Sequence, residues 1–225
     1  MFISVPLMMR RAKTPSYSKD EVVPQAQSKL NANYPDIQKH WDGAHEVYAA
    51  RVLPGQYYVS GSEQEMITTV LGSCISACIR ERVLKIGGMN HFMLPEGDAK
   101  MDGMAARYGA YAMEHLINDI LKVGGRRENL EVKIFGGGRM MRGLNDIGKK
   151  NISFVRAFLE LEQIDIVAED VGLDFSRKIY YFPTTGRVLV KRLRSLHANM
   201  VIHEEEVYER TLHDKPVSND IELFD

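Results

Sequence analysis

Hydrophobic and polar positions alternate with two different periods along the middle of the chain, and the shorter period predicts strands. Segment 74–80, CISACIR, carries an apolar residue at every second position, as a strand does when one face is buried. An apolar, β-branched run at 65–73 predicts a strand that ends at Gly72, and a second apolar run at 85–94 predicts another strand. Because only a short polar link separates segment 74–80 from 85–94, these two are expected to pair as an antiparallel hairpin.

A period near one helical turn predicts two helices. Apolar residues in segment 107–125 recur about a turn apart, and Gly124 and Gly125 supply a stop signal at its end. Segment 151–164 is a second amphipathic helix, with Asn151 as its expected N-cap. The other expected elements are strands at 55–61, 130–138 and 164–172 and a hairpin over 177–193 that turns at Thr184-Thr185-Gly186.

This order of elements favours an α/β or α+β fold in which helices pack against a layered mixed sheet. Residues 1–42 are polar, contain several prolines and lack a sustained period, which predicts a flexible N-terminal extension. Residues 43–203 are expected to form the folded domain. The acidic segment 204–225 is interrupted by proline and is interpreted as a solvated C-terminal tail.

Composition narrows the choice of partners and compartment. A formal net charge of −1 gives no electrostatic reason to expect nucleic acid, and no apolar run is long enough for direct insertion into a membrane. The N-terminus lacks the pattern of a secretory signal. Two cysteines four positions apart do not make a disulfide scaffold. A cytoplasmic protein is expected.

The sequence LGSC at 71–74, followed by a histidine in the next strand, predicts a reactive thiol. A cysteine becomes a strong nucleophile as the thiolate, and a nearby imidazole can take its proton. In the predicted hairpin, Cys74 opens one strand and His91 sits late in the other, so their side chains are expected to meet. Gly72 permits a sharp bend, and N–H groups near Ser73 and Cys74 are candidates for stabilising an oxyanion.

Several alternatives accompany this prediction. Either Thr68 or Thr69 supplies a hydroxyl to orient the imidazole, and the residues alone do not decide between them. Cys78 is interpreted as a small buried hydrophobe. A zinc site made of Cys74, Cys78 and His91 is the weaker interpretation, because the spacing is wrong and no fourth ligand is evident.

The glycine loop FGGGRMM at 135–141 lacks either phosphate-binding pattern. It is interpreted as a tight strand exit that packs close to another backbone, with a substrate-cleft wall as an additional role. The basic stretch RVLVKRLR is interpreted as a solvated face.

Five motifs in order give the chain a resemblance to a known family: LGSC, GGMNHFMLP, FGGGRMM, IGKKNISFVRAFLELEQIDIVAEDVGL and RKIYYFPTTGRVLVKRL. Together they resemble the CheD family of chemoreceptor glutamine deamidases over Gln56–Leu193. The resemblance implies a fold similar to the catalytic domain of cytotoxic necrotizing factor toxins. It places the nucleophile on Cys74, the histidine base on His91 and the family's threonine on Thr68.

The function implied by the resemblance is hydrolysis of specific glutamine side chains to glutamate on methyl-accepting chemotaxis receptors. This chemistry requires no metal or cofactor. The implied partners are the cytoplasmic helical bundle of a chemoreceptor, as substrate, and a CheC-type phosphatase. Two other hypotheses stay open: a non-catalytic module that binds receptor or CheC, and a cysteine hydrolase acting on small amides.

Overall fold

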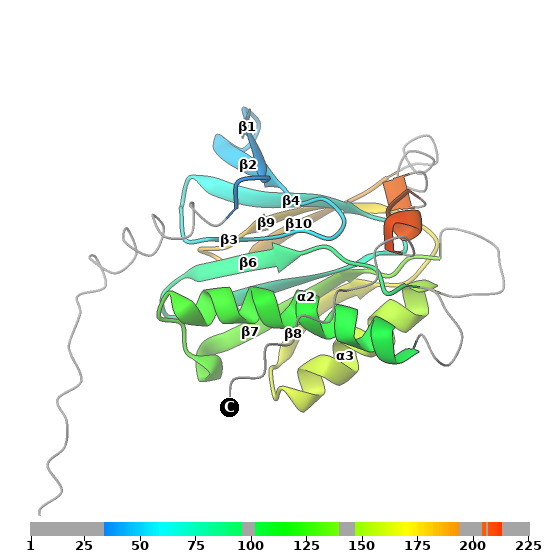
Figure 1. Ribbon diagram of the computed structural model, residues 1–225. Coiled ribbons are helices and arrows are strands. Elements are labelled where there is room, and N and C mark those ends of the chain that lie inside the picture. The colour runs from blue at the N-terminus through cyan, green and yellow to red at the C-terminus, as the bar shows by residue number, and fades with distance from the viewer. Residues whose placement is uncertain (1–33, 96–101, 140–146, 194–203, 206, 213–225) are drawn as a thin grey trace, which may run out of the picture.

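The computed structural model describes residues 34–95, 102–139, 147–193, 204–205 and 207–212, which are arranged as two stacked sheets and a layer of helices (Figure 1). The first sheet has the order β1 (Gln38–Asp42), β2 (Val47–Arg51), β4 (Glu65–Leu71), β9 (Arg177–Phe182) and β10 (Arg187–Arg192). The second sheet has the order β3 (Tyr57–Ser60), β6 (Ile86–Asn90), β5 (Ile75–Glu81), β7 (Leu130–Gly136) and β8 (Ile166–Val171).

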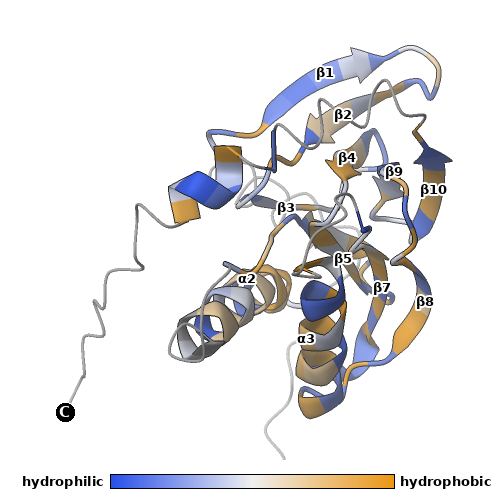
Figure 2. Cartoon of the chain, turned by 90° about the vertical axis from the view of Figure 1, so that its right-hand side faces the viewer, coloured by the Kyte–Doolittle hydropathy of each residue, from blue (hydrophilic) through white to orange (hydrophobic). Residues whose placement is uncertain are grey.

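Both sheets are mixed, because β2 runs parallel to β4 and β7 runs parallel to β8 while their other pairs are antiparallel. The helices α2 (Asp102–Lys122) and α3 (Ile147–Leu161) cover the second sheet on its outer side (Figure 2). A short 3₁₀ turn, η1 (Arg127–Asn129), precedes β7. Residues 204–205 and 207–212 are helical and are called the C-terminal helix below.

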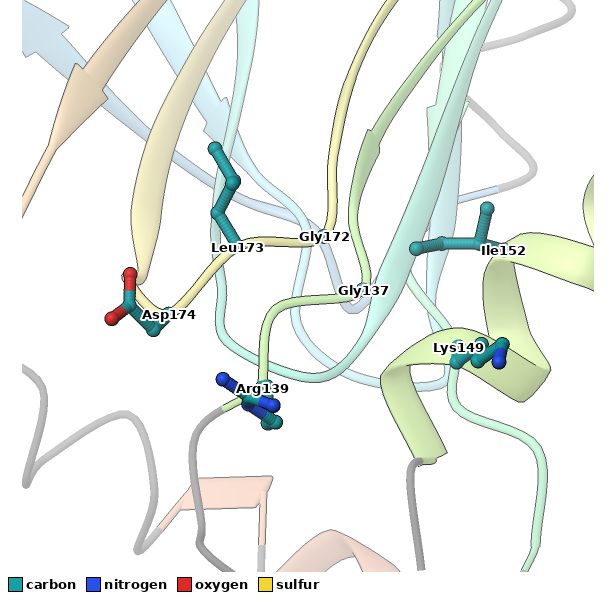
Figure 3. A pocket seen from close by; sticks show the side chains of 7 residues that line it. All are labelled: Gly137, Arg139, Lys149, Ile152, Gly172, Leu173 and Asp174. Atoms are coloured by element: carbon teal, nitrogen blue, oxygen red, sulfur yellow. The ribbon is translucent and has the colours of Figure 1, made fainter.

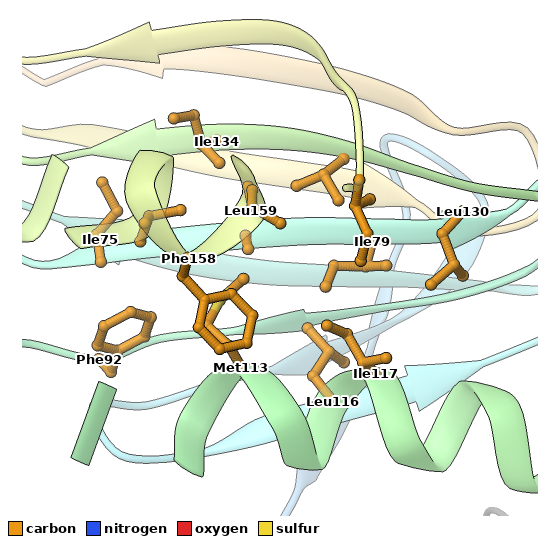
Figure 4. Close-up of a cluster of buried hydrophobic side chains, with 14 of the residues drawn as sticks. Ile75, Ile79, Phe92, Met113, Leu116, Ile117, Leu130, Ile134, Phe158 and Leu159 are labelled. Carbon is orange, nitrogen blue, oxygen red and sulfur yellow. The ribbon is translucent and has the colours of Figure 1, made fainter. Parts of the chain in front are cut away.

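Strand β5 is buried on both faces because it lies at the centre of these layers. Its odd-numbered residues, such as Ile75 and Ile79, pack against apolar side chains of α2 and α3 (Figure 4). Cys78 points the other way, into a core shared by the two sheets, and Cys74 just before the strand does the same. A continuous apolar strand is expected where both faces are covered.

The hairpin predicted from the alternating pattern is confirmed. Strand β5 pairs antiparallel with β6, with Cys78 opposite Met89. The α+β layered class is also confirmed, although the strands divide between two sheets instead of forming one. The second helix begins at Ile147, so Asn151 lies inside α3 and the prediction that it is an N-cap is wrong.

Both predicted extensions differ in part from the structure. Strand β1 lies within the segment predicted to be flexible, yet it pairs with β2. The folded domain therefore begins before residue 43. Residues 1–33 lie outside the described residues. The interpretation of 204–225 as a solvated tail is wrong for Glu205, whose side chain is buried at 6% exposure. Residues 213–225 also lie outside the described part.

No helix within the described ranges is both long and apolar enough to cross a membrane.

Candidate active site

The register of the β5–β6 hairpin brings Cys74 and His91 together. Just beyond the regular ladder, Ile75 and Phe92 exchange both backbone hydrogen bonds, at 2.9 and 3.0 Å. Cys74 and His91 are therefore diagonal neighbours on one face of the sheet, within side-chain reach. The Cys74 sulfur, a ring nitrogen of His91 and a carboxylate oxygen of Glu205 all lie within 4.8 Å of one another.

The glycine loop after β7 fixes the backbone bend before β5. The N–H of Gly138 donates to the carbonyl of Gly72, and the N–H of Gly137 donates to the carbonyl of Cys74, each at 2.7 Å. Gly136 has a φ of +108°, and a Cβ there would lie 2.2 Å from the Cys74 carbonyl oxygen. The interpretation of FGGG as a strand exit packed against another backbone is thus confirmed, and that backbone is the bend that carries Cys74.

Asn151 braces the same bend from α3, and sequence reasoning missed this role. Its side-chain nitrogen donates to the carbonyl of Ser73 at 2.9 Å, while its oxygen accepts from the N–H of Leu94 at 2.9 Å. The side chain is fully buried. Gly148, one turn earlier on α3, allows the helix to approach the glycine loop, because a Cβ there would lie 2.5 Å from the Gly137 carbonyl oxygen.

With those carbonyls held on one side, three consecutive backbone N–H groups point together on the other side. The N–H groups of Gly72, Ser73 and Cys74, called the N–H nest below, donate to the carboxylate of Glu205 at 2.9 Å each. The Ser73 hydroxyl adds a fourth hydrogen bond to it at 2.7 Å. Converging N–H groups of this kind form an anion site. The acidic composition of its segment gave no signal that Glu205 would lie here.

The imidazole of His91 is oriented by Thr69. The Thr69 hydroxyl donates its hydrogen to the carbonyl of Val52 at 2.7 Å and lies 2.8 Å from Nδ1 of His91. Because its single hydrogen is already used, the hydroxyl accepts from Nδ1–H. The neutral ring is therefore protonated on Nδ1, and Nε2, which has no hydrogen-bond partner among the described residues, is the free basic nitrogen.

The resemblance implied Thr68, whereas the threonine that contacts His91 is its neighbour Thr69. The alternation of side chains along β4 explains the difference. Ile67 and Leu71 point into the core between the sheets, so Thr69 points there too, toward His91. Thr68 lies on the opposite face of β4. In this structure the hydroxyl that contacts the imidazole is therefore that of Thr69.

The two reactive groups are both neutral in this arrangement. Burial raises the pKa of the Cys74 thiol well above its ordinary value, and the adjacent Glu205 carboxylate raises it further. Burial lowers the pKa of His91 to about 4. The expected thiolate–imidazolium pair is thus absent while Glu205 occupies the N–H nest. Cys78 lies in the core at 2% exposure, and burial raises its pKa, as expected for a structural cysteine.

A cleft of about 190 Å³ reaches His91 from the surface between the 55–57 segment and α2. Its lining is Gly55, Gln56, Tyr57, Asn90, His91, Tyr108, Tyr111, Ala112 and His115. A larger pocket of about 470 Å³ lies beside the glycine loop, where Arg139 and Lys149 come from its two sides (Figure 3). The loop therefore lines a pocket as well as supporting the bend at Gly72–Cys74.

Cys74, His91 and Glu205 also have the residue types of a three-ligand metal site. The hydrogen bonds of Glu205 argue against this use. Each of its two oxygens already accepts two hydrogen bonds. An ion could bind here only by displacing some of these hydrogen bonds or the one between the carboxylate and the Cys74 thiol. The predicted alternative with Cys78 as a ligand also fails, because Cys78 is outside this cluster.

Comparison with known proteins assigns the chain to a family. A family model described as CheD chemotactic sensory transduction matches residues 93–192. A "Probable chemoreceptor glutamine deamidase CheD" of Janthinobacterium sp. (strain Marseille) is 50% identical over 202 residues, covering 88% of this chain and 99% of the relative. The protein of the same description from Hahella chejuensis is 51% identical over 195 residues, covering 85% and 92%.

These alignments leave out only residues near the chain ends, so they include Cys74 and His91. Among solved structures, a Neisseria meningitidis protein of the DUF152 family covers 52% of this chain and 53% of its own at 10% identity, with a TM-score of 0.34. A likeness that low says nothing about function.

Proposed function

Because the chain belongs to the CheD family, we propose that it hydrolyses the side-chain amide of glutamines on chemoreceptors, with Cys74 as the nucleophile. The observation that supports the chemistry best is the convergence of three groups at one point. The Cys74 thiol, a ring nitrogen of His91 and the N–H nest all lie around the position now held by the Glu205 carboxylate, and Nε2 of His91 has no hydrogen-bond partner among the described residues. These are the parts required for acyl transfer through a tetrahedral intermediate.

In the first half of the reaction the Cys74 sulfur attacks the amide carbon of the glutamine as Nε2 of His91 takes the thiol proton. The oxygen of the intermediate accepts hydrogen bonds from the N–H nest. The C–N bond then breaks, and ammonia leaves with the proton from His91. In the second half water, deprotonated by His91, attacks the thioester and releases glutamate and the thiol. Thr69 keeps Nδ1–H in place throughout.

The proposed substrate segment is the cytoplasmic helical bundle of a chemoreceptor, and the enzyme would work in the cytoplasm. A CheC-type phosphatase is a second proposed partner. The cleft between the 55–57 segment and α2 supports the assignment of a receptor as substrate, because it gives a glutamine side chain from outside a route to His91.

The direct test is to incubate the protein with receptor cytoplasmic fragments and to look for Gln-to-Glu conversion by peptide mass spectrometry. Conversion at specific glutamines, abolished by Cys74→Ala and by His91→Ala, is expected. Receptor fragments that bind the wild-type protein and stay fully amidated would contradict the proposal.

One observation favours the second hypothesis, a non-catalytic receptor- or CheC-binding module. Cys74 has no exposed surface in the structure. The same assay separates the two, because a binding module retains the receptor with or without Cys74 and converts no glutamine.

A further inference from the structure

The group that fills the N–H nest is chemically the product of the proposed reaction. Hydrolysis of a glutamine leaves a glutamate, and the group held by the nest is the side chain of a glutamate, Glu205. Its carboxylate accepts four hydrogen bonds from the N–H nest and the Ser73 hydroxyl, and one of its oxygens lies within 4.8 Å of both the Cys74 sulfur and a His91 ring nitrogen. The proposed hydrolysis has no step that needs a carboxylate supplied by the enzyme at this position.

The rest of the C-terminal helix packs against the protein beside the site. Tyr208, one turn after Glu205, contacts the hydroxyl of Tyr108 on α2. It also covers Gly55, where a Cβ would lie 3.0 Å from the Tyr208 hydroxyl oxygen. Glu204 faces Arg51 at 3.4 Å. A groove of about 380 Å³ runs along the helix and is lined by Leu53, Pro54, Glu204, Val207, Tyr208 and Thr211.

Resting on the proposed deamidase function, we infer that the C-terminal helix occupies the enzyme's own substrate site, with Glu205 in the position of the product glutamate. A helix that presents an acid side chain to the nest and an aromatic side chain one turn later shows how a receptor helix can dock there. A receptor helix and the C-terminal helix then compete for the same surface. Figure 1 shows the C-terminal helix, in orange and red, at the end of the sheets where the β4–β5 bend lies.

The surroundings of Cys74 agree with this assignment. Glu205 contributes a negative charge and a hydrogen bond that both keep the thiol protonated. Cys74 has no exposed surface and Glu205 only 6%, so the helix is part of what separates the thiol from solvent. Displacing the helix from the site would open the N–H nest and remove one cause of the raised pKa of Cys74.

The sharpest test converts the product-like residue into a substrate. In Glu205→Gln, the Cys74 sulfur should form a bond to the amide carbon of Gln at 205, the C–N bond should break, and ammonia should leave with a proton from His91. Water then cleaves the thioester and restores glutamate at 205. Purified Glu205→Gln protein is therefore expected to acquire the mass of an amide-to-acid conversion at that position, at a rate independent of protein concentration.

Two controls isolate the reaction. The double variant Cys74→Ala/Glu205→Gln should keep its amide, which separates catalysis from spontaneous deamidation. Glu204→Gln is the matched control, because it lies on the same helix next to Glu205 but faces Arg51. Its amide should persist even with Cys74 intact.

A second readout is the rate with receptor fragments. Glu205→Ala removes four hydrogen bonds to a charged group, so it should raise receptor deamidation about tenfold or more and should speed alkylation of Cys74. If the protein converts receptor glutamines, yet Gln at 205 stays amidated and Glu205→Ala leaves the receptor rate unchanged, this inference is wrong and the proposed function stands. If neither receptor glutamines nor Gln at 205 are converted, the proposed function fails as well.

Discussion

The hydroxyl of Thr69 lies 2.8 Å from Nδ1 of His91 and orients the imidazole without supplying a charge. In serine protease triads an ionised carboxylate has this place and stabilises the imidazolium that forms. A hydroxyl fixes the tautomer but supplies no charge to an imidazolium; the nearby charge that favours one is the Glu205 carboxylate. The low pKa of His91, which burial moves to about 4, fits an orienting partner that is neutral.

Replacing Thr69 by Val should lower kcat about tenfold or more, because Nδ1–H loses its buried acceptor and the ring loses its fixed orientation. Thr69→Ser keeps the hydroxyl and should restore most of the rate. Kinetics of receptor-fragment deamidation as a function of pH is the measurement, since a misoriented base changes the profile while a packing defect alone does not.

Thr68→Val tests whether the imidazole is oriented by Thr69, as the structure indicates, or by Thr68, as the family resemblance implied. Thr68 lies on the opposite face of β4, so its loss should cost less activity than the loss of Thr69. A larger loss in Thr68→Val than in Thr69→Val would return the orienting role to Thr68.

The sequence was sufficient for the hairpin and insufficient for the third member of the site. Alternation along β5 and a short polar link predicted that Cys74 and His91 would meet. Choosing between Thr68 and Thr69 requires knowing which face of β4 meets the second sheet, and both residues follow the same apolar run. That face is set by how the two sheets stack, a property of distant strands.

Glu205 and Asn151 were missed for similar reasons. Glu205 is 131 positions from Cys74 along the chain and belongs to an acidic segment whose composition is typical of a solvated surface. Asn151 begins a good amphipathic pattern, so an N-cap was the simplest interpretation. Its actual role depends on α3 starting a turn earlier, at Ile147, so that Gly148 lies against the glycine loop.

Gly136→Ala should destabilise the protein by about 2 kcal/mol or more, because its backbone is left-handed and its new Cβ would collide with the Cys74 carbonyl. Gly103→Ala is the matched control, since a Cβ at that exposed position on α2 meets nothing within 4 Å. It should leave stability unchanged or slightly raised. Urea denaturation of both variants gives the comparison. Equal stabilities would show that the close approach of Gly136 to the Cys74 carbonyl does not constrain the fold.

Asn151→Ala should lower both stability and activity. It leaves the Ser73 carbonyl and the Leu94 N–H without their buried partner, at about 1–3 kcal/mol for each unsatisfied group. Lys150→Ala, an exposed neighbour on α3, is the control and should behave as wild type. If Asn151→Ala lowers stability but its folded fraction turns over at the wild-type rate, the bend does not depend on this brace.

A chelator should leave the deamidation rate unchanged, because the proposed reaction uses no metal and the Glu205 carboxylate is held by hydrogen bonds from residues 72–74. The assay is receptor-fragment conversion before and after dialysis against EDTA, with metal content measured on the same samples. A rate that falls on dialysis and recovers with one equivalent of zinc would make Cys74, His91 and Glu205 metal ligands.

The buried His91 predicts that acid weakens the fold in a defined window. Its folded pKa is about 4, below the value of about 6.5 for an unfolded histidine, so between these values the unfolded chain binds more protons. The contribution of His91 to stability is complete above about pH 6.5 and is lost as the pH falls toward 4, at about 1.4 kcal/mol per pKa unit. Urea unfolding at a series of pH values, followed by circular dichroism, measures the loss.

The comparison with His91→Gln assigns the effect to this residue, because carboxylates elsewhere titrate in the lower part of the window. The variant should lose less stability than wild type between pH 6.5 and 5, where ordinary carboxylates are still ionised. His45, which is half-buried beside Asp42 and has its Nδ1 3.0 Å from that carboxylate, is the matched control. His45→Gln should keep the wild-type acid dependence that His91 causes, and a wild-type slope retained in His91→Gln would mean that His91 is not held neutral by burial.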